Sequence, residues 1–552
     1  MKEKMRMSYL QESPFFLTEE QEKWVQETKC ALTLEQKAGQ LFCVMGGDYT
    51  PEELKDLVKN SRVGGILFRP IVPAEEIRNY YKPLDKVAPI PLLKAANLEE
   101  GGSGGISDGT LFGWPMTVAA ADDDAVTENF GRVCAIEGKN VGINWTFSPV
   151  CDIDMNYLNP ITNVRTFGSD INKVIKNTEI YVKTVQSFGM AACAKHFPGD
   201  GVDYRDQHLH PTYNSLSAEE WYNSYGKVYE NLIQNGLMSI MVGHIVQPAV
   251  AMDVNPSLTL EECLPASLSR ELLTGVLREK YGFKGLITTD ATIMGGFTMA
   301  MERKKAIPTA IMAGCDMIVF NTNLAEDYQY ILDGIKSGLL TEERLDEAVE
   351  KILALKAKVC VEQKTLEIDG AALHKDCVDK AVTLVKNNAP QILPISKEKY
   401  PFIRLITLGK DDILDGSVRE IAKEVLESKG FLVEICEPYA DDLHGTKALE
   451  KKRLTLYFAN YEQASNQTVV RIDWCKKHAL DMPRFIYEED SVFVSLASPY
   501  NLQDVPRVKT YINAYTATRA SIEACVEKLI GLSEFKGVSP VDPFCGLIDT
   551  RL

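Results

Sequence analysis

Short apolar segments alternate with amphipathic segments over roughly the first two thirds of the chain. Short, mostly apolar runs are typical of parallel strands that are buried on both faces, and the stretches between them have helical spacing. The clearest predicted helix is Leu339–Lys358, with apolar residues at i, i+3 and i+4. The predicted strands are Gln40–Met45, Gly64–Phe68, Leu92–Ala96, Ile143–Phe147, Ala191–Ala194, Ser239–Val242, Gly285–Thr288 and Met317–Phe320.

Eight strands with intervening helices predict an N-terminal (β/α)8 barrel, an α/β fold, over residues 1–358. A poorly periodic stretch, 359–376, is the predicted linker, and residues 377–552 form a second α/β region. We expect this region to be a smaller, doubly wound, flavodoxin-like α/β sandwich. Its predicted strands are Phe402–Leu408, Phe431–Ile435, Leu454–Phe458 and Val492–Ser495, and its predicted helices are Asp376–Asn387, Ser417–Ser428 and Arg519–Ile530.

Composition and charge narrow the classes of function. The 552 residues are 45% hydrophobic and 25% charged, which is ordinary for a globular protein. Lys and Arg number 60 against 77 Asp and Glu, a net charge of −17, which argues against nucleic acid as a partner. Met1–Phe16 lacks the apolar core of a secretory signal, and the apolar runs are too short to span a membrane. The 13 scattered cysteines, with no CxxC, indicate reduced thiols in a cytoplasmic protein.

Polar residues gather directly after the predicted barrel strands, where barrel enzymes carry their active sites. Three of the seven histidines lie in the single loop after the fifth strand. The candidates by strand are Glu99 and Glu100 after the third, Asp152 and Arg165 after the fourth, Lys195, His196, Asp200, Asp203, Asp206, His208 and His210 after the fifth, His244 after the sixth, and Asp290 after the seventh.

These residue types suit the cleavage of a glycosidic bond. A retaining glycosidase needs a nucleophilic carboxylate with a proton donor close to it. Asp290 is rigidly placed for the first role. Residues i and i+2 of an extended segment face the same side, so Asp206 can set the tautomer of His208 and leave its other nitrogen for proton transfer. Lys195, His196 and Arg165 would then bind sugar hydroxyls.

Other interpretations of the same residues stay open. A lone Asp at a strand end is more often a cap or an ion-pair partner, and Arg165 can be a surface cation. The histidines and aspartates of the fifth loop have the chemistry of zinc or manganese ligands, although no HExxH spacing is present. The glycines of residues 101–105 do not match a phosphate-binding loop, and Glu99 and Glu100 would repel phosphate.

Several motifs in order resemble glycoside hydrolase family 3, within it the β-N-acetylglucosaminidase branch. The resemblance spans roughly residues 30 to 545, and Ser498–Tyr500 and Tyr511–Tyr515 are similar to the family's C-terminal domain. The barrel motifs are TLEQKAGQLF at 33–42, NP at 159–160, VRTFG at 164–168, KHFPG at 195–199, DQH at 206–208 and GLITTDA at 285–291 with Met294.

The resemblance implies that Asp290 is the nucleophile and that His208, supported by Asp206, is the acid/base. Residues matching Lys195, His196 and Arg165 bind the sugar, and we place Asp152, Glu99, Glu100, Asp200, His244 and Met294 in the substrate pocket with them. The family's β-glucosidase branch takes a Glu from the second domain instead, so the Asp-x-His dyad favours N-acetylglucosaminide. Two departures concern the sugar pocket: Asp200 stands where the family usually has a second His, and Asn97–Gly102 lacks the usual Asp.

The sequence therefore predicts a cytoplasmic, retaining exo-β-glycosidase that releases terminal β-linked N-acetylglucosamine from a small glycoside or oligosaccharide. We expect no metal, no cofactor, no nucleic acid and no membrane partner, and a homodimer stays open. The alternatives are a β-glucosidase or a phosphate-using phosphorylase of the same family, a catalytically silent sugar-binding protein, and a metal-dependent hydrolase.

Overall fold

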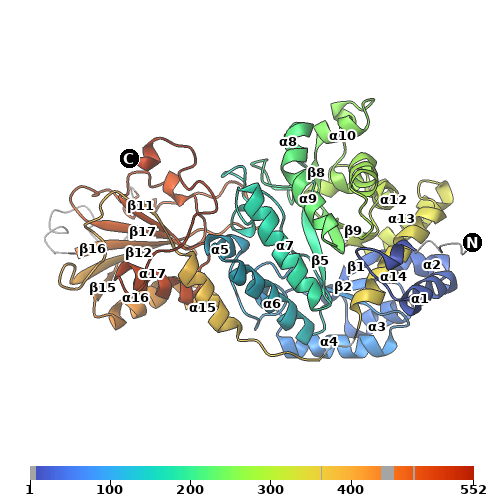
Figure 1. Cartoon of the computed structure of the whole chain (residues 1–552), viewed down its shortest axis with the longest axis horizontal. Coiled ribbons are helices and arrows are strands. Elements are labelled where there is room, and N and C mark those ends of the chain that lie inside the picture. The colour runs from blue at the N-terminus through green and yellow to red at the C-terminus, as the bar shows by residue number, and fades with distance from the viewer. Residues whose placement is uncertain (1–7, 362–363, 437–452, 477–478) are drawn as a thin grey trace, which may run out of the picture. The chain divides into compact units, whose positions relative to one another are not determined.

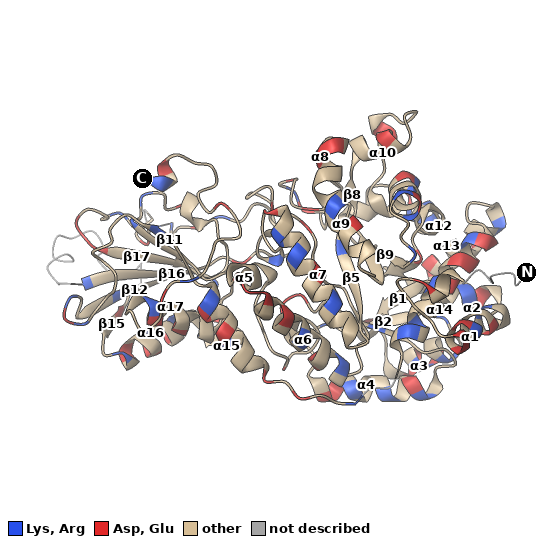
Figure 2. Ribbon diagram, in the orientation of Figure 1, with Lys and Arg blue, Asp and Glu red and all other residues tan. Residues whose placement is uncertain are grey.

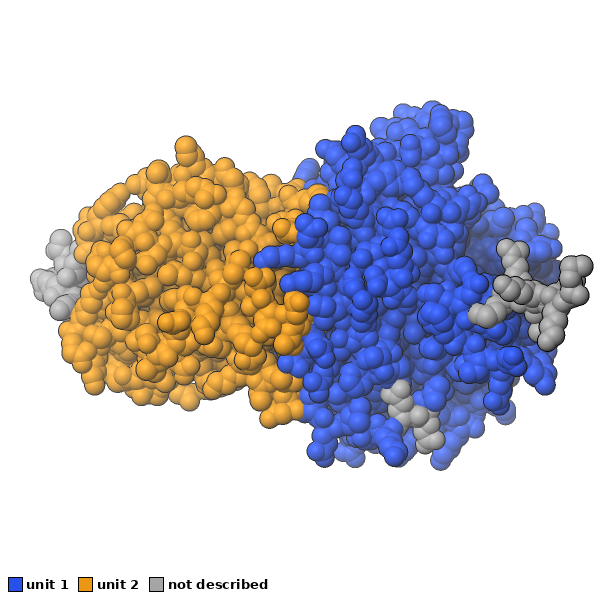
Figure 3. Space-filling model, in the orientation of Figure 1, with its two compact units in different colours: residues 1–111, 128–153, 171–368 blue, residues 112–127, 154–170, 369–552 orange. Residues whose placement is uncertain are grey.

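The computed structural model describes residues 8–361, 364–436, 453–476 and 479–552. The chain divides into two compact units (Figure 3). The barrel unit comprises residues 1–111, 128–153 and 171–368, and the sandwich unit comprises residues 112–127, 154–170 and 369–552. Two segments from the first 358 residues thus pack with the C-terminal part of the chain. The sequence-based domain boundaries stay predictions, and residues 362–363 of the predicted linker lie outside the described residues.

The barrel unit contains a closed sheet of eight parallel strands in the order β1-β10-β9-β7-β5-β4-β3-β2 (Figure 1). Each strand begins in one of the eight apolar segments singled out in the sequence, so the predicted barrel is confirmed. The strands are β1 (Phe42–Met45), β2 (Gly65–Leu67), β3 (Leu93–Ala96), β4 (Trp145–Thr146), β5 (Ala191–Phe197), β7 (Ser239–Val242), β9 (Leu286–Ala291) and β10 (Met317–Val319).

Two of these strands run further than the sequence pattern indicated. Strand β5 continues through Lys195 and His196 to Phe197, and β9 continues through Asp290 to Ala291. The polar residues that follow the apolar runs are therefore still held in the barrel wall. A side chain on a strand is positioned more rigidly than one on a loop, which is an advantage for a catalytic group.

Helices surround the barrel strands, and their charged residues lie away from the largely uncharged strands (Figure 2). The predicted helix at 339–358 is α14, which begins later than expected because the Thr341 hydroxyl caps it by accepting from the Arg344 N–H. The helices along this part of the chain are α1 (Glu19–Ala31), α2 (Leu34–Gln40), α3 (Pro51–Lys59), α4 (Ala74–Val87), α5 (Pro115–Ala120), α6 (Asp124–Asn140), α7 (Ile171–Ser187), α8 (Ala218–Asn223), α9 (Tyr225–Gln234), α10 (Pro248–Val254), a π-helix (Glu271–Lys280), α11 (Gly295–Thr298), α12 (Arg303–Ala313), α13 (Leu324–Ser337) and α14 (Glu342–Val359).

The sandwich unit is built on a six-stranded sheet in the order β11-β18-β17-β16-β12-β15, with β11 antiparallel at one edge. Its strands are β11 (Thr383–Asn387), β12 (Phe402–Gly409), β15 (Leu432–Ile435), β16 (Arg453–Asn460), β17 (Ser491–Ser495) and β18 (Thr510–Asn513). One apolar cluster packs the sheet against helices α15 (Gly370–Ala381), α16 (Val418–Ser428) and α17 (Arg519–Leu529). Residues outside the α-helices, such as Ile472 and Leu502, pack against the other face.

In the sandwich unit, one predicted helix is shorter than expected, and the sheet contains two strands that were not predicted. The helix expected at 376–387 is α15, which ends at Ala381, and Thr383–Asn387 is instead the edge strand β11. Strand β11 exists because it pairs with β18, whose residues come more than a hundred positions later. We predicted neither strand from its local sequence pattern, and the pairing that defines this edge of the sheet joins segments far apart in the sequence.

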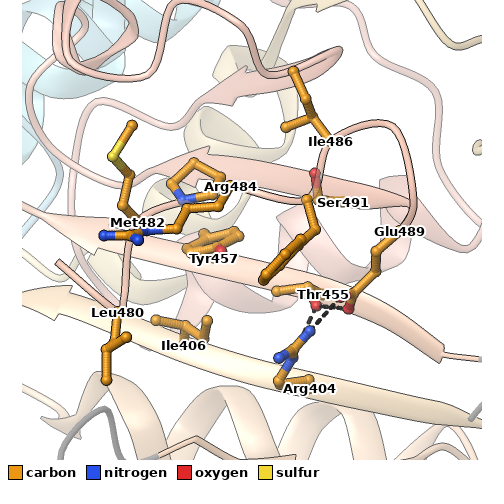
Figure 4. Close-up of a pocket in the computed structure, with 12 residues that line it drawn as sticks. Arg404, Ile406, Thr455, Tyr457, Leu480, Met482, Arg484, Ile486, Glu489 and Ser491 are labelled. Carbon is orange, nitrogen blue, oxygen red and sulfur yellow. Dashed lines mark hydrogen bonds and ion pairs between the residues drawn. The ribbon is translucent and has the colours of Figure 1, made fainter. Parts of the chain in front are cut away.

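A buried ion pair lies in a pocket between the second face of this sheet and residues 480–486 (Figure 4). The Arg404 Nε donates to the Thr455 Oγ1 at 3.0 Å, and Arg404 also pairs with Glu489. The remainder of this pocket is mainly apolar, with Tyr457 and Leu480 in its lining. The paired charges satisfy each other at low exposure, which is the usual condition for burying them.

Among the described residues, no helix is both long and apolar enough to cross a membrane.

Candidate active site

Asp290 stands at the C-terminal end of β9, with its side chain 15% exposed. Its Oδ1 accepts from the Ala291 N–H at 2.7 Å, and its Oδ2 lies 3.9 Å from the His196 Nε2. Burial alone would raise the pKa of Asp290, but nearby positive charge, led by His196, outweighs burial and lowers the pKa. The carboxylate is therefore held ionised and partly open, as a nucleophile must be.

His196, in β5, is oriented from behind by Asp152. The His196 Nδ1 lies 2.6 Å from the Asp152 Oδ2, and the His196 backbone N–H donates to the Asp152 Oδ1 at 3.2 Å. The Asp152 side chain has no exposed surface. A carboxylate at Nδ1 keeps a proton on that nitrogen and turns Nε2 toward Asp290. Asp152, predicted to contact substrate, is thus placed to orient His196.

Asp206 and His208 meet as expected, but in a turn that the Leu209 N–H closes by donating to the Asp206 carbonyl at 3.0 Å, and not in the extended segment that the sequence argument assumed. The Asp206 Oδ1 lies 2.6 Å from the His208 Nδ1 and accepts from the His208 backbone N–H at 2.9 Å. The Asp206 side chain is fully buried, whereas that of His208 is 23% exposed. The carboxylate fixes the Nδ1–H tautomer and leaves Nε2 for proton transfer.

Lys195 and Glu99 form a buried ion pair at the ends of β5 and β3. The Lys195 Nζ lies 2.5 Å from the Glu99 Oε1 and 3.1 Å from the Asn97 Oδ1. Asn97, in the segment that lacks the family's usual Asp, therefore shares a lysine with Glu99. Glu100, the next residue, is half-buried.

Asp200 and His244 are bound by other residues of the barrel unit. The Asp200 Oδ2 accepts from the Gln207 Nε2 at 3.1 Å, and its Oδ1 accepts from the Gly201 N–H at 2.8 Å. The His244 Nδ1 lies 2.9 Å from the Ser267 Oγ, and its Nε2 donates to the Ala291 carbonyl at 3.1 Å. Burial lowers the pKa of His244 to about 4, so the ring is neutral and supports the strand that carries Asp290.

The last two predicted pocket residues lie in different units. Met294 is buried at the start of α11, in the barrel unit. Arg165 ends the short 3-10 helix Asn163–Arg165 of the sandwich unit, where its guanidinium donates to the Ile161 carbonyl at 3.3 Å. Its role with substrate stays a prediction.

The loop residues proposed as metal ligands mostly bind other groups. Asp203 pairs with the Arg205 guanidinium at 2.7 Å and accepts from the Tyr213 N–H at 2.9 Å. The His210 Nδ1 lies 3.2 Å from the Pro211 carbonyl. Within the described ranges, no three His, Cys, Asp or Glu side chains are grouped so that they could hold a metal ion.

The sequence reasoning missed Gln207, which lies between the two dyad residues in the sequence and whose buried side chain binds Asp200 and the His244 backbone N–H. Its place in the middle of the DQH motif was the available signal.

A closed parallel barrel with a carboxylate at the end of its seventh strand, and an Asp–His pair on the loop after the fifth, defines a glycoside-cleaving barrel enzyme. The comparisons agree: the chain belongs to glycoside hydrolase family 3, because the family's N-terminal domain profile matches residues 33–355. The chain is accordingly an O-glycosyl hydrolase by family, which confirms the resemblance seen in its motifs.

Two similar proteins match nearly the whole chain. A Beta-N-acetylglucosaminidase/beta-glucosidase of Cellulomonas fimi is 39% identical over 98% of this chain and 99% of its own. The solved structure of the Beta-glucoside phosphorylase BglX bound to 2FGlc is 41% identical, with a TM-score of 0.92 over 98% of this chain and 100% of its own. A Beta-hexosaminidase of Pseudomonas aeruginosa is 28% identical over 50% of this chain and 81% of its own.

Proposed function

We propose that this enzyme is a retaining exo-β-glycosidase that removes terminal β-linked N-acetylglucosamine, with Asp290 as nucleophile and His208 as acid/base. The observation that carries the proposal is the pairing of the His208 Nδ1 with the buried Asp206. This pairing orients a partly exposed imidazole ring and leaves its Nε2 for proton transfer. The full-length similarity to the Cellulomonas fimi enzyme supports the choice of sugar and makes β-glucoside the second substrate to test.

The reaction proceeds in two displacements at the anomeric carbon. An Asp290 carboxylate oxygen attacks that carbon while the bond to the leaving oxygen breaks, and His208, which enters this step protonated on both ring nitrogens, gives that oxygen the Nε2 proton. The product is a covalent glycosyl-enzyme. His208 then removes a proton from water, which displaces Asp290 and releases the sugar with its original anomeric configuration.

Inorganic phosphate as the acceptor is the second candidate. A histidine acid/base carries no negative charge in its neutral form, so it does not repel an anionic acceptor as a carboxylate would. The similarity to the solved β-glucoside phosphorylase favours this acceptor. Phosphate oxygen would then displace Asp290 and give a sugar 1-phosphate in place of the free sugar.

Turnover of a nitrophenyl glycoside panel tests the proposal: β-N-acetylglucosaminide, β-glucoside, β-xyloside and β-galactoside, each with and without phosphate. We expect the N-acetyl sugar to be preferred. Acceleration by phosphate, with sugar 1-phosphate as product, would establish phosphorolysis. Preference for β-xyloside or β-galactoside would refute the proposed sugar. No turnover of any glycoside in the panel would favour a sugar-binding protein.

His208→Ala tests the acid role directly. It should slow substrates with poor leaving groups by about 100-fold or more, because general acid catalysis typically contributes that much. A nitrophenyl substrate, whose leaving group needs little protonation, should be cleaved with little change in kcat/KM. Equal losses on both substrates would remove His208 from the acid role.

All 13 cysteines lie in the described part of the chain, and no disulfide joins any of them. This supports the proposed cytoplasmic location, where thiols stay reduced.

A further inference from the structure

The segment that carries the dyad rests on the first residues of α11, five and six positions beyond Asp290. The Gly295 N–H donates to the His208 carbonyl at 2.8 Å, and the Gly296 N–H donates to the Gln207 carbonyl at 3.0 Å. Two consecutive amides therefore hold the backbone of His208 against the chain that follows the nucleophile.

The approach is too close for any side chain at either glycine. A Cβ at Gly295 would lie 2.1 Å from the Leu209 carbonyl oxygen and 3.1 Å from the His208 carbonyl oxygen. A Cβ at Gly296 would lie 2.6 Å from the His244 Cβ and 2.7 Å from the Gln207 carbonyl oxygen. These neighbours are backbone or buried atoms, so an added methyl group must push the dyad segment away.

Gln207 holds the same segment from its other side. Its Nε2 donates to the Asp200 Oδ2 at 3.1 Å, and its Oε1 accepts from the His244 backbone N–H at 2.7 Å. Gln207 is 1% exposed and Asp200 is 3% exposed, so both bonds are shielded from water. The segment is thereby fixed to the loop after β5, to the end of β7 and to the start of α11.

We infer that Gly295, Gly296 and Gln207 are positioning residues that set the place of the His208 ring relative to Asp290; the inference rests on the proposed function. Proton transfer to the leaving oxygen requires hydrogen-bond distance, and a displacement of about 1 Å can cost on the order of 100-fold in rate. Asp200, which stands where the family usually has a histidine, belongs to this support through Gln207.

Gly295→Ala and Gln207→Ala test the inference, with Gly47→Ala as the matched control. No atom lies within 4 Å of a Cβ at Gly47, so the same added methyl group meets nothing there. The measurement is kcat/KM for two aryl glycosides of the same sugar, one with a dinitrophenyl leaving group and one with a methylphenyl leaving group. Thermal unfolding of each variant accompanies it.

We expect both test variants to lose about 10- to 100-fold on the methylphenyl glycoside and less than about threefold on the dinitrophenyl glycoside, because only the former needs the proton. Gly47→Ala should match the native enzyme on both. Gln207→Ala creates no clash, so it decides the matter if Gly295→Ala does not fold. Equal losses on the two glycosides, or no loss on either, would overturn the inference.

His208→Ala in the same assay distinguishes failure of the positioning role from failure of the proposed acid/base role of His208. If His208→Ala shows the leaving-group selectivity and the positioning variants do not, only the inference fails. If His208→Ala lacks that selectivity, the proposed function fails and the positioning role fails with it.

Discussion

Asp152→Asn tests the support of His196 directly, because it keeps the shape of the side chain and replaces one hydrogen-bond acceptor, a carboxylate oxygen, with an NH2 donor. Asp152 Oδ1 accepts from two backbone N–H groups, those of His196 at 3.2 Å and Asp200 at 2.7 Å. The amide oxygen of asparagine can keep both bonds. The amide nitrogen then replaces Oδ2, which lies 2.6 Å from the His196 Nδ1.

The substitution changes which nitrogen of the His196 ring carries a proton. In the native enzyme Nδ1 carries a proton toward Asp152, whereas in the variant it must accept one from the amide. The ring changes tautomer and loses its hydrogen bond to a buried carboxylate. A hydrogen bond to a charged group contributes about 1.5–3 kcal/mol, and each 1.36 kcal/mol is tenfold in rate. We therefore expect kcat/KM to fall by about 10- to 150-fold.

The assay is kcat/KM on the preferred nitrophenyl glycoside, alongside thermal unfolding. Asp327→Asn is the matched control: the Asp327 side chain is equally buried and accepts from the Arg303 Nε at 2.8 Å, so its partner is an arginine and not His196. The control should change stability while leaving kcat/KM near native. An Asp152→Asn enzyme with native kcat/KM, or one whose loss of activity is matched by Asp327→Asn, would refute the reasoning.

Three further predictions concern the nucleophile, a buried histidine and metal. Asp290→Asn should abolish turnover of every glycoside in the panel while circular dichroism stays native; retained activity would remove Asp290 as nucleophile. Burial lowers the pKa of His244 to about 4, so the unfolded chain binds a proton that the folded chain does not between pH 6.5 and 4. Stability that is fully present above pH 6.5 should fall by up to about 3 kcal/mol as the pH drops to about 4, measured by urea unfolding, and His244→Gln should flatten this loss; parallel pH profiles would contradict it. A chelator should leave activity unchanged, and a loss that zinc restores would favour the metal-dependent hydrolase.

The sequence by itself determined the barrel, because each strand is a local apolar run buried on both faces, and such runs are visible without knowing their neighbours. It also placed Asp290 at a strand end and brought Asp206 to His208, since an i, i+2 contact depends only on the local backbone.

Only the tertiary structure decided which distant residues meet. Asp152 bonds to His196 across 44 positions, and Glu99, on the loop after β3, pairs with Lys195 in β5. The backbone at Gly295 approaches Leu209 more closely than any side chain would allow. Strand β11 likewise exists through its pairing with β18, which lies between β11 and β17 in the sheet. Local pattern carries no information on partners that the closed barrel and the sheet bring together, so these contacts could not be predicted from the sequence.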